Sequence, residues 1–307
     1  MKRTDLALEV RESIPEDDKE IQGVILKREQ DEDNEIEITR LIIKDQKGAK
    51  AMGKPIGTYI TMEVKHIDEL QGEKEEQFIS KLKNDIEELI TNVDIEGKFL
   101  KEKSVFIVGL GNREVTPDRL GPKVIDEIVT TRHFIREFGE DLKQKYCMNI
   151  VTALAPGVMA QTGMETKEIV KGIINEVKPD FIIVIDALAA RSVKRLNCTI
   201  QLTDTGISPG SGVGNHRNSL NKESLGVPVI AIGVPTVVDA GTIVEDYLEE
   251  ALKKQGFSEN EIYSFVQEIN QNSIKNMFVT PNNVDEAVEH MGFLIAEALN
   301  DCFVSKE

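Results

Sequence analysis

The spacing of hydrophobic residues predicts two different kinds of structure along the chain. In residues 21–66, apolar and polar residues alternate in the segments GVILKRE, NEIEITRLIIK and GTYITMEVKH. This alternation is typical of antiparallel strands that turn one face toward solvent. Residues 73–93 then carry apolar side chains at helical spacing. We therefore expect residues 21–100 to form an antiparallel β extension with one helix.

From residue 101 onward, apolar runs alternate with helical patterns, which is typical of a mostly parallel sheet covered by helices. Buried strands are expected at VFIVGLGN, MNIVTALAPG, PDFIIVID, CTIQL and VPVIAIGVPT. Helices are expected from about Leu120, over Glu165–Val177, over about Ala240–Lys254, and from Val284 to Leu299. The predicted fold class is α/β, with a mostly parallel central sheet flanked by helices, and residues 101–307 form the core of the domain.

The first 20 residues differ from the rest of the chain. They are polar and charged without a sustained period, so their composition predicts a leader without regular structure. The remaining residues, 21–307, can bury a large core, and we expect them to form a single α/β domain.

Charge and cysteine content narrow the possible partners and location. The chain has 37 Lys and Arg against 54 Asp and Glu, a formal net charge of −17, which argues against a nucleic-acid-binding surface. The N-terminus lacks the apolar core of a signal peptide, and no apolar run is long enough to span a bilayer. Three cysteines, none in a CxxC pair, are typical of a reducing compartment. We expect a cytoplasmic protein without direct nucleic-acid or membrane partners.

Two aspartates follow buried strands. Asp186 comes directly after the apolar run Phe181–Ile185, where a parallel strand delivers side chains to the crevice at its carboxyl end. Asp118 lies in the loop VTPDRLGP, after the strand VFIVGLGN. Each aspartate also has a simpler interpretation, because a carboxylate at such a position can cap a turn or the start of a helix.

If both aspartates face the crevice, they can perform acid–base chemistry. Two carboxylates held close together cannot both ionise easily, so Asp118 and Asp186 would provide an acid beside a base. Such a pair can activate a water molecule and protonate a leaving amine, as peptide hydrolysis without a covalent intermediate requires. Two alternatives stay open: a metal-dependent hydrolase that uses the same acidic pair, and a non-catalytic module that binds a peptide or a nucleotide.

Glycine-rich turns follow several of the predicted strands. The turn Gly109-Leu110-Gly111 resembles the start of a dinucleotide-binding fingerprint, but Glu114 stands where that fingerprint needs its third glycine. Further glycine-rich segments lie at residues 155–166, 204–215 and 233–240. Since no Walker lysine follows them, they favour tight turns or the lining of a peptide cleft over phosphate binding. We expect no cofactor.

Several sequence blocks together resemble the germination protease family of spore-forming bacteria. They are GLGNREVTPDRLGP, APGVMAQTGMET, PDFIIVIDALAARS, DTGISPGSGVGNHR, LGVPVIAIGVPTVVDA and MFVTPNNVDEAVEHM. The resemblance implies an endopeptidase in the spore core that begins the degradation of small acid-soluble spore proteins during germination. It also implies an atypical aspartic-type peptidase, related in fold to hydrogenase-maturation peptidases, that assembles as a homotetramer.

The resemblance also assigns residues of this chain. It implies that the two essential aspartates of the family are Asp118 and Asp186. Gly210 stands where the related nickel-sensing peptidases would have a histidine, so no metal is implied. The family is made as a zymogen that cleaves itself after an acidic residue followed by an apolar one and alanine. The segment RTDLALE fits that pattern and predicts a cut between Asp5 and Leu6, with residues 1–5 as the propeptide.

Overall fold

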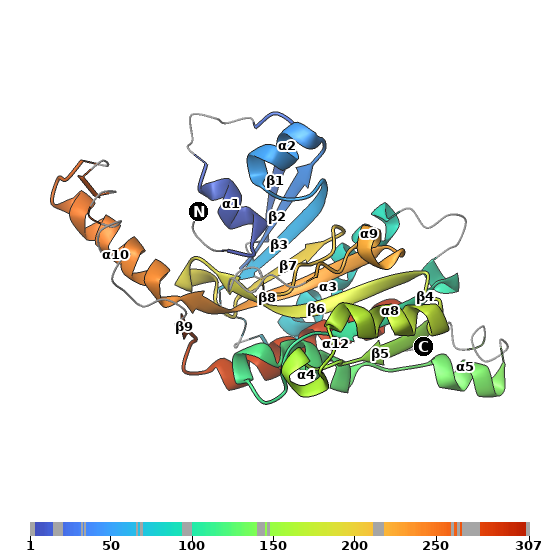
Figure 1. Cartoon of the computed structure of the whole chain (residues 1–307). Coiled ribbons are helices and arrows are strands. Elements are labelled where there is room, and N and C mark those ends of the chain that lie inside the picture. The colour runs from blue at the N-terminus through green and yellow to red at the C-terminus, as the bar shows by residue number, and fades with distance from the viewer. Residues whose placement is uncertain are drawn as a thin grey trace.

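Nine strands among the described residues form one continuous sheet, in the order β1-β2-β3-β7-β8-β6-β4-β5, with β9 paired to β8 (Figure 1). The structure is a computed structural model that describes residues 4–14, 21–31, 33, 35–65, 67, 70–93, 100–139, 145, 148–210, 218–258, 261, 262, 265 and 277–304. The strands are β1 (Val24–Asp31), β2 (Ile36–Ile43), β3 (Gly57–Val64), β4 (Ser104–Gly109), β5 (Ile150–Leu154), β6 (Phe181–Ala190), β7 (Thr199–Thr203), β8 (Val229–Asp239) and β9 (Phe278–Val279).

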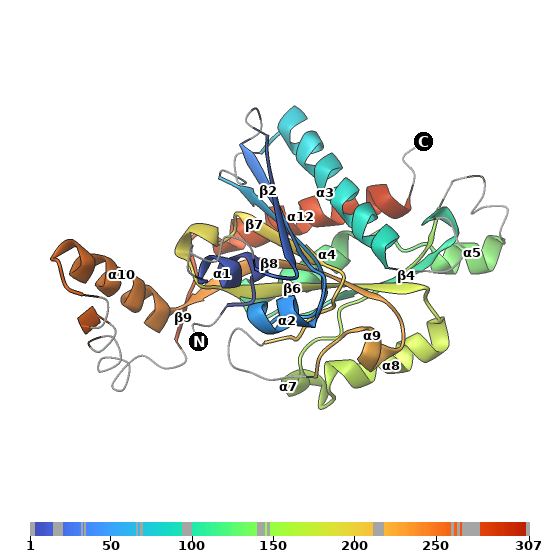
Figure 2. The same ribbon diagram turned by 90° about the horizontal axis from the view of Figure 1, so that it is seen from above.

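The helices cover both faces of this sheet. They are α1 (Ala7–Glu12), α2 (Gln46–Met52), α3 (Glu73–Asn92), α4 (Leu120–Glu127), α5 (Arg132–Phe138), α7 (Met159–Thr162), α8 (Thr166–Val177), α9 (Lys222–Leu225), α10 (Ala240–Lys254) and α12 (Val284–Phe303). Helices α3, α4 and α12 lie on one face, and α8 and α9 lie on the other (Figure 2). No helix in the described ranges combines the length and apolar character that crossing a membrane requires.

The parallel part of the sheet consists of β5, β4, β6 and β8. Strand β4 and residues 181–185 of β6 read as apolar runs because helices bury both faces of the sheet there. One face packs on α3, α4 and α12 through a large apolar cluster, and a smaller cluster joins the other face to α8 and α9. The expected α/β class with helices flanking a central sheet is therefore confirmed.

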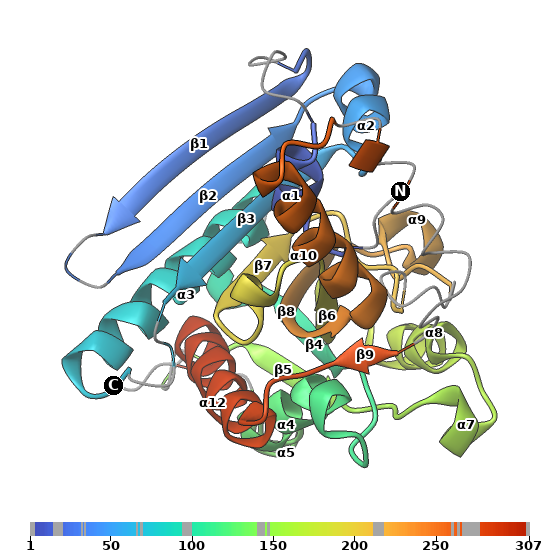
Figure 3. The same cartoon turned by 90° about the vertical axis from the view of Figure 1, so that its left-hand side faces the viewer.

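The antiparallel extension belongs to the same sheet. Strands β1, β2 and β3 lie side by side, and β3 pairs with β7, which joins them to the core (Figure 3). Strand β7 runs antiparallel to both of its neighbours, so the sheet as a whole is mixed, with a parallel part and an antiparallel extension joined through β7. The reason is the short connection 191–198 between β6 and β7, because a parallel crossover needs a dozen or more residues.

The N-terminal arm, residues 4–14, is folded against the sheet. Leu6, Ala7 and Leu8 are almost completely buried, and α1 begins at Ala7. Leu6 packs with Leu188 of β6 and its neighbours, whereas Ala7 joins a second apolar cluster under β2 and α2. The expectation of a leader without regular structure is therefore wrong for residues 7–12. These residues take up regular structure because apolar clusters receive Leu6 and Ala7, and because Asp5 and Glu9 bond to the backbone of residues 189–192.

Candidate active site

Asp186 lies inside β6 rather than at the end of the strand. The pairing of β4 with β6 ends at Gly109 and Ile185, and the backbone N–H of Leu110 donates to the Ile185 carbonyl at 2.8 Å. On its other side, β6 continues to pair with β8 as far as Ala190, with an irregularity after Leu188. Asp186 is 6% exposed. Because the pairing with β4 ends just before it, no strand lies beside Asp186 on that side, and its carboxylate lines a pocket there.

Asp118 ends a short 3-10 helix, Thr116–Asp118, in the loop after β4. Its Oδ2 accepts a hydrogen bond of 2.8 Å from the backbone N–H of Asn112. The N-cap of α4 is Arg119, which makes no capping side-chain bond, so the interpretation of Asp118 as a helix cap is wrong. The carboxylate instead closes its own loop and is held beside the carboxyl end of β4.

Glycines allow the close approach of backbone segments around this loop. Gly111 has a φ of +117°, and a Cβ there would lie 1.8 Å from the Asp118 carbonyl oxygen. A Cβ at Gly109 would lie 2.1 Å from the Gly121 carbonyl oxygen, which shows how closely α4 packs on β4. The glycine pattern that resembles a dinucleotide fingerprint is therefore explained by packing.

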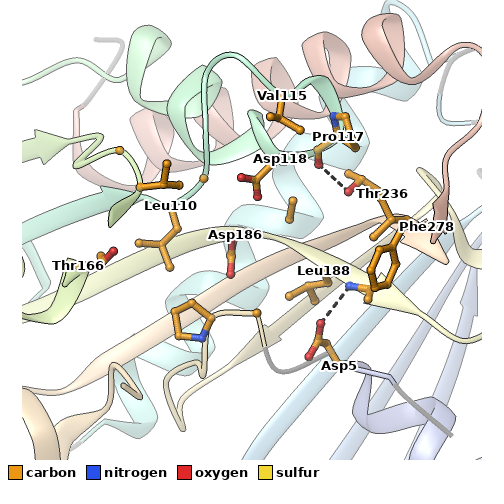
Figure 4. Close-up of a pocket in the computed structure, with 18 residues that line it drawn as sticks. Asp5, Leu110, Val115, Pro117, Asp118, Thr166, Asp186, Leu188, Thr236 and Phe278 are labelled. Carbon is orange, nitrogen blue, oxygen red and sulfur yellow. Dashed lines mark hydrogen bonds between the residues drawn. The ribbon is translucent and has the colours of Figure 1, made fainter. Parts of the chain in front are cut away.

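One pocket of about 350 Å³ is lined by both Asp118 and Asp186. In Figure 4, Asp118 lies on the loop above β6, and Asp186 lies on β6 itself. The Thr236 hydroxyl of β8 donates to the Pro117 carbonyl at 2.7 Å, which ties the Asp118 loop to the sheet. The side chains are thus brought together from β6, β8 and the loop after β4.

The three glycine-rich segments all reach this pocket. Its lining includes Gly157, Val158 and Thr166 from the first, Pro209 and Gly210 from the second, and Thr236 and Val237 from the third. The third segment belongs to β8 rather than to a loop. Residues 211–217 of the second lie outside the described residues. Phe278 of β9 also lines the pocket; sequence reasoning did not single it out, although it lies in the family block MFVTPNNVDEAVEHM.

Asp5, at the predicted cleavage position, lines the same pocket. Its backbone N–H donates to the Ala189 carbonyl at 3.0 Å. Its Oδ2 accepts from the Ala189 N–H, also at 3.0 Å (Figure 4). The arm therefore lies against β6 three residues beyond Asp186. Residues 1–3 of the predicted propeptide lie outside the described residues.

A second cavity, of about 590 Å³, adjoins the first, and Asp5 and Leu188 line both. Lys54 and Gln201 line the second cavity. Burial lowers the pKa of Lys54, against the opposing effect of the Asp5 and Glu9 carboxylates. Sequence reasoning missed Lys54 and Gln201, because the first lies in a stretch that reads as a turn and the second in a short strand.

Glu9 anchors the arm further along. It is 3% exposed, and its carboxylate accepts hydrogen bonds from the backbone N–H groups of Arg191 at 2.7 Å and Ser192 at 2.9 Å. Arg195 Nη1 lies 3.5 Å from the same carboxylate. The buried Glu9 carboxylate is therefore surrounded by several donors, which offset the free-energy cost of burying its charge. Within the part of the chain that the structure describes, no three His, Cys, Asp or Glu side chains are grouped so that they could hold a metal ion.

Comparison with a solved structure gives a distant similarity. A [NiFe] hydrogenase maturation protease, HycI from Thermococcus kodakarensis, matches 65% of this chain and 94% of its own, at 18% sequence identity and a TM-score of 0.33.

Sequence comparison gives much stronger matches. The profile of the peptidase family described as germination protease matches residues 1–269. The germination protease of Caldanaerobacter subterraneus subsp. tengcongensis is 44% identical, over 97% of this chain and 93% of its own. That of Clostridium perfringens is 38% identical, over 97% and 94%, and that of Bacillus cytotoxicus is 47% identical, over 83% and 68%. The chain therefore belongs to the germination protease family.

Proposed function

We propose that this protein is an endopeptidase of the spore core that starts the degradation of small acid-soluble spore proteins during germination. Family membership supports the role of a spore protease, because the similar proteins are named germination proteases. Beyond this role, the proposal names the substrate, the catalytic residues, the self-processing and the assembly of this chain.

The proposed catalytic groups are Asp118 and Asp186. One carboxylate takes a proton from a water molecule, whose oxygen bonds to the peptide carbonyl carbon. The other, protonated carboxyl group gives its proton to the peptide nitrogen as the C–N bond breaks. The products are a new carboxylate and a new amine, and no covalent intermediate with the enzyme forms.

A single observation carries this proposal: Asp118, Asp186 and Asp5 line one pocket. The first two arrive from separate strands, and the third belongs to the segment that fits the self-cleavage pattern. Chain segments far apart in sequence thus bring two acids and a candidate peptide bond to the same place.

Processing is proposed to occur between Asp5 and Leu6, which makes the described form the zymogen. The docked arm supports this, because it lies beside β6 with Leu6 buried and Asp5 at the pocket. While the arm is in place, part of the groove beside Asp186 is filled by the protein's own chain. Another polypeptide would bind there only after the arm has left.

The active protein is proposed to be a homotetramer. Helix α10 extends away from the sheet (Figure 1), and Tyr247 on it is 66% exposed. Of its residues only Ala240 and Thr242, at its start, are buried. Light scattering at micromolar concentration is expected to give four times the mass of one chain, and a monomer would contradict the assembly.

The test of the catalytic proposal uses the variants Asp118→Asn and Asp186→Asn in the full chain. Each is expected to abolish self-cleavage and digestion of a purified small acid-soluble spore protein. The wild-type protein is expected to yield a new N-terminus at Leu6, read by mass spectrometry. Full activity in either variant would remove that aspartate from the mechanism.

Two other outcomes would point to other functions. Activity that is lost in a chelator and restored by a divalent ion would indicate a metal-dependent hydrolase. Tight binding of the spore protein by the wild-type chain without any cleavage would indicate a binding module.

A further inference from the structure

A lysine outside the acid pocket contacts the carbonyl group at the proposed cleavage site. Lys54 Nζ donates a hydrogen bond of 2.9 Å to the carbonyl oxygen of Asp5. Gln201 Nε2 lies 3.4 Å from the same oxygen, and Gln201 Oε1 accepts from the Ala7 N–H at 2.6 Å. The two side chains therefore bracket the peptide bond between Asp5 and Leu6.

The local backbone explains how Lys54 reaches this position. Helix α2 ends at Met52, and Gly53 takes a left-handed conformation with φ of +59°. Pro55 follows Lys54, and its carbonyl accepts a hydrogen bond from the Tyr59 hydroxyl of β3 at 3.0 Å. The helix end and the strand thus fix both sides of Lys54, so its side chain is directed into the second cavity.

The peptide bond lies where the two cavities meet. Asp5 lines the pocket that contains Asp118 and Asp186, and it also lines the cavity that contains Lys54. The acids and the ammonium group therefore approach Asp5 from two cavities of the groove. Water activated by the acids can act on this peptide group from one cavity. The cation can contact the carbonyl oxygen from the other, so the two do not compete for space.

The proposed reaction has a need that the aspartates do not meet. When water attacks a peptide carbonyl, the carbonyl oxygen becomes negatively charged, and donors aimed at that oxygen lower the barrier. A carboxylate that has accepted a proton from water offers no positive charge to this oxygen. An ammonium group in a partly buried setting does, and its effect there exceeds that in water.

We propose that Lys54 is a further catalytic residue, which stabilises the negative charge that develops on the Asp5 carbonyl oxygen during self-cleavage. Gln201 is a positioning residue. Its side-chain amide contacts the Asp5 carbonyl oxygen and the Ala7 N–H, and thereby fixes the same peptide unit. The inference rests on the proposed cleavage between Asp5 and Leu6 by the aspartate pair. A substrate segment with the same acidic–apolar–alanine pattern would place its carbonyl on the same ammonium group.

The ammonium group of Lys54 keeps its protons throughout the reaction. It donates a hydrogen bond to the carbonyl oxygen while the oxygen of water bonds to the carbon. When the C–N bond breaks, the electron pair of that bond leaves with nitrogen, and nitrogen takes its proton from the acid pair. The carbonyl is then restored as part of the new carboxylate.

The experiment measures the first-order rate of self-cleavage in the full chain. Lys54→Met is expected to lower the rate about 100-fold, the effect typical of removing one donor to a developing oxyanion. Lys54→Arg, which keeps a positive charge, is expected to recover part of that loss. Lys50→Met is the matched control, because Lys50 is an exposed lysine in the last turn of the same helix. It is expected to cut at the wild-type rate.

A second measurement separates catalysis from docking of the arm. Hydrogen exchange of residues 6–12 is compared between Asp186→Asn and the double variant Asp186→Asn/Lys54→Met, both of which stay uncut under the proposed function. Equal protection together with the 100-fold loss of rate supports the catalytic role. Loss of protection in proportion to the loss of rate would reduce Lys54 to a docking contact and overturn the inference. Lys54→Met that cuts within threefold of wild type, or Lys50→Met that is equally slow, would also overturn it.

Failure of the underlying function gives a different result. If Asp186→Asn cuts normally, or if the new terminus is not Leu6, the proposed function and the Lys54 inference both fail. If both aspartate variants are inactive and the terminus is Leu6, the Lys54 variants alone decide the matter.

Discussion

Replacement of Gly111 by alanine is expected to lower the rate of self-cleavage about 100-fold while the fold persists. The new Cβ would lie 1.8 Å from the Asp118 carbonyl oxygen, where real contacts are at least 3.0 Å. The backbone segments at Gly111 and Asp118 must therefore separate by about 1.2 Å, the difference between these two distances. Misplacement of a catalytic group by about 1 Å can cost about 100-fold in rate.

The same substitution also lowers stability. A left-handed backbone costs an alanine about 1–2 kcal/mol, and overpacking costs about 1–3 kcal/mol more. We therefore expect the free energy of unfolding to fall by about 2–5 kcal/mol, measured by urea denaturation.

A matched control separates the two contributions. Gly226 also has a positive φ, +82°, but a Cβ there would meet no atom within 4 Å. Gly226→Ala should therefore show only the backbone cost, with self-cleavage at the wild-type rate. If Gly111→Ala is folded and cuts as fast as Gly226→Ala, then the position of Asp118 does not control the reaction.

Two further predictions concern buried carboxylates away from the acid pair. Burial raises the pKa of Asp85 from 3.8 to about 6, despite its ion pair with Arg40, so the folded state holds the proton more tightly than the unfolded state. The bound proton adds up to about 3 kcal/mol to the free energy of unfolding. This contribution is complete below pH 3.8 and is lost as the pH rises to about 6. Asp85→Asn should remove this dependence from denaturation curves between pH 4 and pH 7, and an unchanged slope would contradict it. Glu9→Gln should weaken docking of the arm by about 1–3 kcal/mol, because a neutral acceptor replaces a charged one. Hydrogen exchange at residues 6–12 should then rise about 5- to 150-fold. Unchanged exchange would mean that Glu9 does not anchor the arm.

Local patterns predicted much of the fold because periodicity reports burial directly. The helix expected over residues 240–254 has the bounds of α10, although only Ala240 and Thr242 of it are buried, and the alternation in residues 36–43 matches the burial of β2. The direction of β7 did not follow from its own residues, because it depends on a connection too short for a crossover. The end of β6 was also misplaced, since the apolar run stops at Asp186 while pairing with β8 continues.

The candidate site was only partly readable from the sequence. Asp118 and Asp186 follow apolar strands, which gives them a local signal, and parallel strands place their ends together. Lys54 and Gln201 carry no such signal, because their roles arise only where the arm, the extension and the core meet. The docking of residues 6–8 was hidden for the same reason: short apolar segments become informative only beside the surface that buries them.

The complete burial of Leu6 makes a cut before it hard to reverse. Hydrolysis would turn an uncharged amide nitrogen into an amine that carries a positive charge at neutral pH. That charge would appear among apolar side chains, beside the new Asp5 carboxylate only until residues 1–5 leave, and a buried charge without a partner costs several kcal/mol. The new N-terminus at Leu6 would then be unstable in its buried position, so the cut that releases residues 1–5 would also favour undocking of the remaining arm.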